Sequence, residues 1–116
     1  MRRAPFIHKR GSEIDEEIES CNEDSPVAYH EGRKNAIDWV RGADSGFHGN
    51  DEIREKMEEK RQDANQNRME EEFEGYERAL GMYEELQWVL KVDDVTVEDG
   101  QAVYRIGNDT FSPSPA

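Results

Sequence analysis

The side chains with the clearest chemical character in this 116-residue chain are carboxylates, and they gather in two stretches. The first stretch holds Glu13, Asp15, Glu16, Glu17 and Glu19, and the second holds Glu70, Glu71 and Glu74. Carboxylates that converge from two helices can bind a divalent metal ion. Carboxylates on the outside of a rigid helix can instead present negative charge much as phosphates do. The two stretches therefore favour either a metal site or an acidic binding surface.

The metal interpretation starts from the spacing of three between Glu13, Glu16 and Glu19. Together with the second stretch, this spacing resembles the paired acidic helices of all-α nucleotide pyrophosphohydrolases, and the resemblance implies a carboxylate-metal nucleotide hydrolase. Such a site needs carboxylates inside the bundle, whereas these acids mostly lie off the apolar faces of the expected helices. The three histidines and the single cysteine also lack the spacing of metal ligands. We therefore expect no metal, cofactor or catalytic residue, and the hydrolase is a second alternative.

Charge restricts the class of partner. The chain has 28 acidic and 15 basic residues, and its formal net charge is −13. This acidity disfavours direct binding to nucleic acid or to an anionic membrane, because their phosphates would be repelled. No apolar run approaches the roughly 18–20 residues that cross a bilayer, and the N-terminus lacks the apolar centre of a signal peptide. We expect a cytoplasmic protein, located in a host cytoplasm or a virion if it is viral.

The N-terminal segment has the opposite charge, because its first ten residues carry four bases and no acid. Pro5 and Gly11 disfavour helix there, so residues 1–11 are expected to form an extended basic arm. A short helix is expected to begin at Ser12, and a second helix is expected over residues 26–41.

A long amphipathic helix is expected over residues 51–90, because no proline or glycine lies between residues 51 and 74. The alternative is a break near residues 63–67, where the sequence is almost wholly polar. Two rows of apolar and small residues recur at spacings of four and three, so one row suits the core and the other a partner. The residues expected to bind that partner are Met69, Phe73, Tyr76, Ala79, Leu80, Met82, Tyr83 and Leu86.

Two pairs of small residues suggest how the helices cross. Gly32 and Ala36 are four residues apart, and so are Gly75 and Ala79. Glycine inside a helix costs about 1 kcal/mol relative to alanine, and close approach of two helices is a natural compensation. We predict that the two pairs face each other.

After Leu90 the apolar period changes from that of a helix to that of a strand. Val95 and Val97 alternate with polar residues, Asp99-Gly100 has the sequence of a hairpin turn, and a second apolar run follows over residues 102–106. The sequence therefore predicts a C-terminal β-hairpin.

Together these elements predict a mainly helical α+β fold with two or three helices, one of them the long helix at about 51–90, followed by the hairpin. The expected division is a basic arm (1–11), a single small domain (12–111) and a flexible tail (112–116). The long helix and the lack of a catalytic pattern favour a non-enzymatic protein-binding or assembly module.

We expect a protein partner, which is either another copy of the chain or a basic protein surface. The protein would then be a homo-oligomer or part of a larger assembly, for example a structural or adaptor protein of a phage. The alternative is an acidic inhibitor that mimics nucleic acid and occupies a host DNA- or RNA-binding protein, as an anti-restriction protein, an anti-CRISPR protein or a polymerase inhibitor would.

Overall fold

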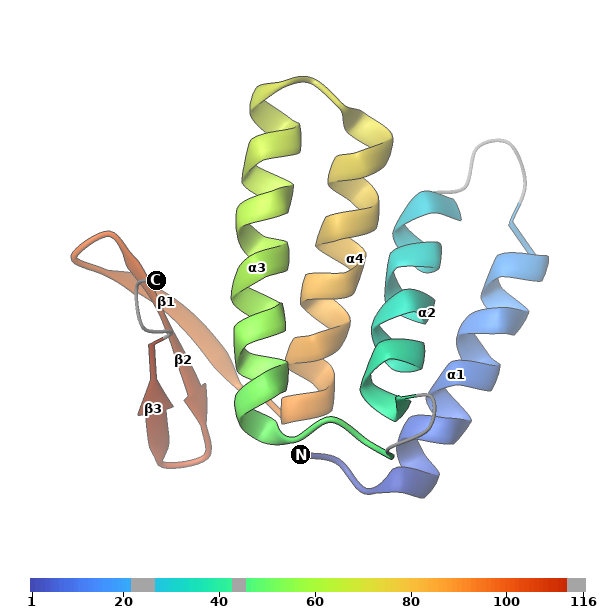
Figure 1. The fold of residues 1–116 in the computed structure, drawn as a ribbon, viewed down its shortest axis with the longest axis horizontal. Helices are drawn as coiled ribbons and strands as arrows, with labels where there is room; N and C mark the ends of the chain where they lie inside the picture. The colour runs from blue at the N-terminus through green and yellow to red at the C-terminus, as the bar shows by residue number, and fades with distance from the viewer. Residues whose placement is uncertain (22–26, 43–45, 113–116) are drawn as a thin grey trace.

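The structure is a computed structural model that describes residues 1–21, 27–42 and 46–112. Its elements are α1 (Ala4–Glu19), α2 (Val27–Arg41), α3 (Asn50–Met69), α4 (Phe73–Leu90), β1 (Asp94–Glu98), β2 (Gln101–Ile106) and β3 (Asp109–Phe111), as Figure 1 shows. The expected fold of two or three helices and a hairpin is wrong, because the described residues form four helices and a three-stranded antiparallel sheet.

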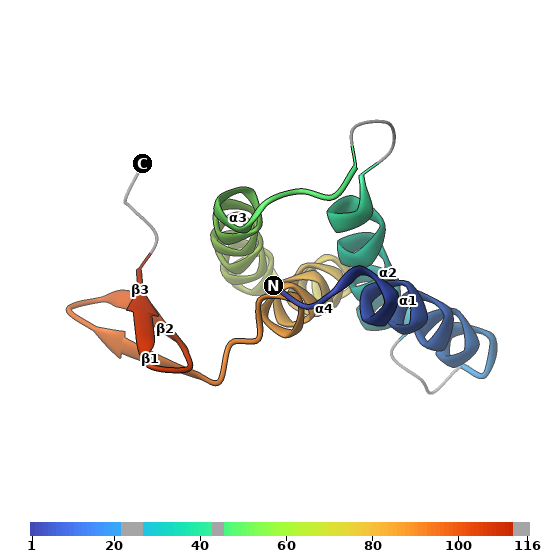
Figure 2. The same cartoon turned by 90° about the horizontal axis from the view of Figure 1, so that it is seen from below.

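Helix α4 lies at the centre of the molecule. It packs against α2 on one side and α3 on the other, while α1 packs on α2. Figure 2 shows the sheet at the opposite end of the molecule from α1. The core is formed mainly by aliphatic side chains from all four helices, joined by β2: Ile7, Ile14, Ala36, Ile37, Val40, Ile53, Met57, Met82, Leu86, Val89, Leu90, Ala102 and Tyr104.

The basic N-terminal segment is helical rather than extended. Pro5 lies in the first turn of α1, where a backbone N–H group would have no hydrogen-bond acceptor within the helix. Ile7 and Ile14 are fully buried, and Gly11 between them is buried against α2. The predicted arm and the predicted helix start at Ser12 are therefore wrong, because two isoleucines seven residues apart hold the basic segment on the core as one helix.

Helices α2 and α4 approach each other at two glycines. A Cβ atom on Gly32 would lie 1.9 Å from the carbonyl oxygen of Arg78, and one on Gly81 would lie 2.1 Å from the carbonyl oxygen of Tyr29. The predicted close contact at Gly32 is confirmed, but its predicted counterpart is wrong. Gly75 lies six residues from Gly81, so it points to a different side of α4 and faces a side chain of α3.

The predicted long helix ends at Met69, and a three-residue turn separates α3 from α4. Glu71 has a left-handed backbone with φ of 60°. Its N–H donates to the carbonyl of Arg68 at 3.2 Å, and the N–H of Glu72 donates to the carbonyl of Asn67 at 2.8 Å. This pair of bonds is the Schellman helix end, which usually uses glycine at the left-handed position. The continuous helix and the alternative break near residues 63–67 are both wrong.

The turn lets α3 bury its few apolar residues against α4. Ile53 and Met57 are fully buried, and Ala64 is 5% exposed. Burying each large apolar side chain contributes about 1.5–3 kcal/mol. A left-handed residue costs about 1–2 kcal/mol. The folded-back hairpin is therefore favoured over one straight helix that leaves this row in water.

The two strands of the predicted hairpin are present, and β3 adds a third. β1 pairs with β2 from Asp94 opposite Arg105 to Glu98 opposite Gln101, and β2 pairs with β3. The residues of the turn, 99 and 100, have φ of 53° and 79°. Two positive φ angles are what a type I′ hairpin turn requires. Of the expected tail, residues 113–116 lie outside the described residues.

Tyr104 attaches the sheet to the helices. It is fully buried, its hydroxyl lies 3.2 Å from the hydroxyl of Tyr83 on α4, and its ring stacks on Phe111 with 5.2 Å between centroids. The guanidinium of Arg54 on α3 lies 4.1 Å from the centre of the Phe111 ring. Aromatic contacts therefore hold the sheet on α3 and α4.

Candidate functional site

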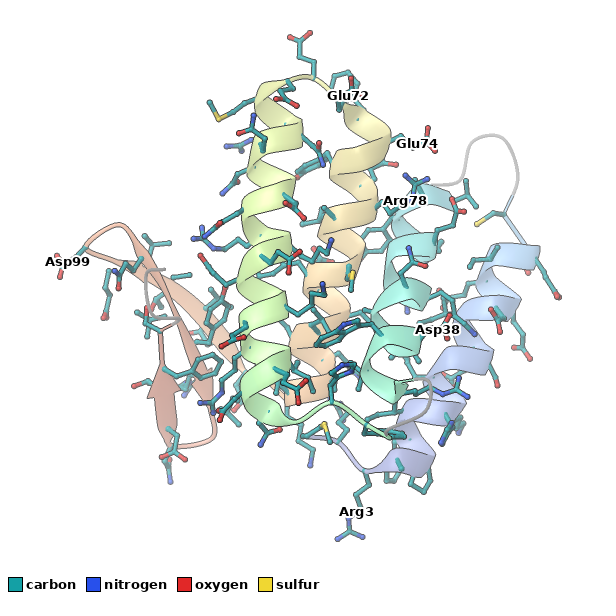
Figure 3. The ribbon with its side chains drawn as sticks, viewed as in Figure 1. Arg3, Asp38, Glu72, Glu74, Arg78 and Asp99 are labelled. Carbon is teal, nitrogen blue, oxygen red and sulfur yellow. The ribbon has the colours of Figure 1, made fainter. Side chains whose placement is uncertain are left out.

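Two large apolar side chains are exposed where α3 turns into α4. Met69 ends α3 and Phe73 begins α4, and they are 77% and 70% exposed. The turn between them, residues 70–72, consists of three exposed glutamates, and exposed Glu74 follows. Figure 3 shows Glu72 projecting from the top of this turn. We call residues 69–74 the α3–α4 tip; its apolar surface among carboxylates suits a partner that has apolar and basic groups.

A row of residues on α4 continues from the tip. Tyr76, Leu80 and Tyr83 follow Phe73 at spacings of three and four, and each is partly exposed. This spacing keeps them on one face of the helix. Five of the eight residues predicted to bind a partner, counting Met69, are thus at least partly accessible.

The other three predicted partner-binding residues belong to the protein's own core. Ala79 and Met82 are each 8% exposed and Leu86 is fully buried. The prediction is wrong for these residues because α4 is covered on two sides, by α2 and by α3. The row that contains Ala79, Met82 and Leu86 is therefore buried within the protein itself.

The acidic residues predicted on α1 are all exposed, but they differ in their contacts. Asp15 lies 2.9 Å from the ammonium of Lys34 on α2, and Glu17 pairs with Arg33. At the tip, Glu74 pairs with Arg78 at 2.8 Å. Figure 1 shows α1 and the tip separated by α2, so the two acidic stretches do not form one surface.

A buried ionic cluster that the sequence analysis does not predict joins α1, α2 and α4. Glu85 is 2% exposed and accepts hydrogen bonds from Arg10 at 2.8 and 3.2 Å and from Arg33 at 3.2 Å. Arg33 also donates to Glu17 and lies 2.8 Å from Nδ1 of His30. Each charge has a partner, as buried charges require. The one available signal was the position of Glu85, four residues after Gly81 on the face that meets α2.

Contacts of α2 with α1 and α4 raise the pKa values of Arg33 and Tyr29. Burial alone would lower the pKa of Arg33, but its hydrogen bonds to Glu17 and Glu85 outweigh burial and raise the pKa. Burial and a hydrogen bond to Glu84 raise the pKa of Tyr29 from 10.0 to about 12. Both residues therefore keep their usual protonation state at neutral pH and act as fixed hydrogen-bond donors.

Two hollows lie beside these surfaces. A cleft of about 290 Å³ between α2, α3 and α4 is lined mainly by polar residues: Asn35, Lys60, Asp63, Gln66, Asn67, Gly75, Arg78, Ala79 and Met82. Its two cations already have acidic neighbours, because Lys60 lies 3.2 Å from Asp63 and Arg78 pairs with Glu74. A second hollow of about 440 Å³ lies between α3 and the sheet, next to Arg54. The charged residues of the cleft are therefore paired. The second hollow is lined by Arg54, whose buried Nε has no hydrogen-bond partner among the described residues, and by Asp109, which is exposed.

The structure does not bring the carboxylates of the hydrolase resemblance together. Within residues 1–21, 27–42 and 46–112, no three histidine, cysteine, aspartate or glutamate side chains are placed to hold a metal ion. In the same parts of the chain, none of the helices has both the length and the apolar character needed to cross a membrane. Met69 and Phe73 are two of the most exposed large apolar side chains among the described residues, and they lie together at the α3–α4 tip.

No protein-family model, curated protein or solved structure matches this chain.

Proposed function

We propose that this protein is a protein-binding module whose α3–α4 tip docks on a basic surface of another protein. The observation that carries the proposal is the exposure of Met69 and Phe73 beside four glutamates. Tyr76 and Leu80, next along α4, extend the surface. Met69 and Phe73 would supply the apolar centre of the interface, and the glutamates its charged rim.

Charge favours a foreign partner over a second copy of the chain. In a two-fold dimer the same patch occurs on both sides of the interface. The glutamates at residues 70, 71, 72 and 74 would then face one another, and juxtaposed like charges cost several kcal/mol. A partner with lysine or arginine around an apolar pocket avoids this repulsion.

Site-directed photo-cross-linking in cells tests the proposal. A photoreactive phenylalanine replaces Phe73 in one variant and Glu59, an exposed residue of α3, in the control. We expect a discrete adduct from position 73 that position 59 does not give. The partner identified in this way should bind the doubly substituted chain, Met69→Ser with Phe73→Ser, at least about tenfold more weakly than the unmodified chain. Identical adducts from the two positions, or an adduct between two copies of the chain, would contradict the proposal.

A second candidate function, mimicry of nucleic acid, is favoured by the outer face of α1. Glu13, Glu16 and Glu19 are exposed and have no basic partner among the described residues. If the cross-linked partner binds nucleic acid, duplex DNA or RNA should compete with this protein for it, and affinity should fall steeply with salt. Substituting Glu13 and Glu16 by glutamine would then weaken binding, whereas docking through the tip alone would leave affinity unchanged.

A further inference from the structure

The sheet has an unpaired edge at β1. The strand order is β1-β2-β3, so one side of β1 has no neighbouring strand among the described residues. Alternate N–H and C=O groups of an edge strand point away from its partner and are free to pair with another chain. All residues of β1 are exposed except Val95, which is partly exposed.

An apolar side chain stands beside this edge. Val97 pairs with Ala102 and Val95 pairs with Tyr104, so all four lie on the side of the sheet that faces the helices. Ala102 and Tyr104 are 5% and 0% exposed, but Val97 is 75% exposed. Figure 1 shows why, because the turn between β1 and β2 extends away from α3. The face of the sheet that is buried at β2 is therefore exposed to solvent near the end of β1.

The opposite side of β1 is acidic. Asp94, Thr96 and Glu98 alternate with the two valines, so both carboxylates point to the side away from the helices. Asp93 and Asp99 flank the strand, and all four acids are exposed. Among the described residues none of the four forms an ion pair with a basic side chain, although Arg105 of β2 lies opposite Asp94 on the same side of the sheet. Asp94 accepts a hydrogen bond from the N–H of Val95, and Asp93 accepts one from the N–H of Gly107. A strand that pairs with this edge would meet valine on one side and carboxylates without ion-pair partners on the other.

A second copy of β1 does not satisfy this edge. In an antiparallel pair centred on Thr96, Asp94 of each copy lies opposite Glu98 of the other. In a parallel pair in register, each acid lies opposite itself. Like charges directly opposite each other destabilise a strand pair. In these two registers the edge therefore selects against its own sequence and in favour of basic residues.

We propose that the free edge of β1 binds an extended, basic segment of a partner protein by strand addition. The added strand places β-branched residues beside Val97 and lysine or arginine beside Asp94 and Glu98. Its backbone pairs with the outward N–H and C=O groups of β1. In doing so it displaces the Asp94 side chain, which accepts a hydrogen bond from the N–H of Val95 at 3.0 Å. This surface is separate from the α3–α4 tip, and neither proposal depends on the other.

The experiment uses a synthetic peptide of about eight residues that alternates valine and lysine, since strands are usually 3–10 residues long. It is titrated into the full chain labelled with ¹⁵N. We expect amide shifts in residues 94–98 and affinity that falls as salt rises. The double variant Asp94→Asn with Glu98→Gln should bind about fivefold more weakly. The matched control, Glu55→Gln with Glu59→Gln, removes the same charge from exposed positions of α3 and should bind as the unmodified chain does.

Two N-methylated peptides separate strand addition from simple charge attraction. Methyl groups on the N–H groups of one edge of the peptide should abolish binding, and methyl groups on the other edge should leave it. Equal binding of the two methylated peptides overturns the proposal, and so does the absence of binding by the parent peptide. Amide shifts confined to residues 69–77 would also overturn it, while remaining consistent with docking at the tip.

Discussion

Helix α4 forms two interfaces that are built differently. Its contact with α2 is close and specific: Gly32 and Gly81 remove the side chains that would keep the backbones apart, and Glu85 is buried between two arginines. Its contact with α3 depends on a sparse row of apolar residues and ends in a tip where Met69 and Phe73 remain exposed. The α2–α4 interface leaves little room for substitution, whereas the tip has surface that the fold does not use.

This difference separates the part of the molecule that fixes the fold from the part available for binding. Interfaces made by backbone contact and buried ion pairs are sensitive to single changes, because neither clashes nor uncompensated charges can be relieved locally. Exposed side chains at a helix end have little effect on stability. Substitutions should therefore have large effects on stability at α2–α4 and small effects at the tip.

The largest expected effect is that of Gly32→Ala. The new methyl group would lie 1.9 Å from the carbonyl oxygen of Arg78, so the two helices must separate. We expect the free energy of unfolding to fall by about 3 kcal/mol, measured by urea denaturation. The control is Gly75→Ala, whose methyl group would lie 3.1 Å from the end of the Asn67 side chain. Alanine also has a higher helix propensity than glycine. Equal losses in both variants would contradict the close α2–α4 contact.

The next largest effect is expected for Glu85→Gln. The substitution keeps the shape of the side chain but leaves the guanidinium groups of Arg10 and Arg33 without their shared buried carboxylate. We expect a loss of about 2 kcal/mol, below the usual range for a broken buried pair because Arg10 is partly exposed. Glu74→Gln on the same helix breaks an exposed pair with Arg78 and should cost less than about 0.5 kcal/mol. A similar small loss at residue 85 would mean that the cluster does not stabilise the α2–α4 interface.

The turn that creates the tip offers a stabilising substitution, Glu71→Gly. Residue 71 has φ of 60°, where glycine has no steric penalty. We expect the free energy of unfolding to rise by about 0.5–1 kcal/mol. The relief of backbone strain in the folded protein outweighs the conformational entropy that glycine adds to the unfolded chain. Glu70→Gly makes the same change at φ of −88° and should give no gain. If residue 71 also gives no gain, the helix does not end there as described.

These cases show what the sequence could and could not predict. Periodicity located the apolar residues of α4, and the Asp99-Gly100 turn located the hairpin, because both depend on local rules. The break at residues 70–72 was missed because the left-handed position holds glutamate, and only the burial of Ile53 and Met57 makes that conformation favourable. The N-terminal helix was missed for the same reason, since Ile7 and Ile14 act through distant contacts.

The candidate site was predicted in part for a related reason. Spacing alone placed Phe73, Tyr76 and Leu80 on one face of a helix and Ala79, Met82 and Leu86 on another. It could not tell which face the rest of the chain would cover. Because α2 covers one side and α3 another, the second row is core and the tip remains open.

Alkaline pH should weaken the α2–α4 interface through Tyr29. Its pKa is raised to about 12 in the folded protein, against an ordinary value of 10.0, because burial and Glu84 disfavour the phenolate. A raised pKa means that the stabilisation is complete below pH 10 and is lost as the pH rises to about 12. Urea denaturation across this range should show a less steep decline for Tyr29→Phe than for the unmodified chain. An unchanged slope would show that Tyr29 is not the group responsible.

The smallest expected effect on stability is that of Met69→Ser combined with Phe73→Ser at the tip. Both side chains are more than two-thirds exposed, so we expect a change of less than about 0.5 kcal/mol in urea denaturation. Leu86→Ala on the same helix, at a fully buried position, should cost about 3 kcal/mol. A loss above about 1 kcal/mol in the double variant would show that the tip packs on the protein itself, and the contrast with α2–α4 would fail. If the loss is negligible, any loss of partner binding in the same variant reports on the docking surface alone, because the fold is unchanged.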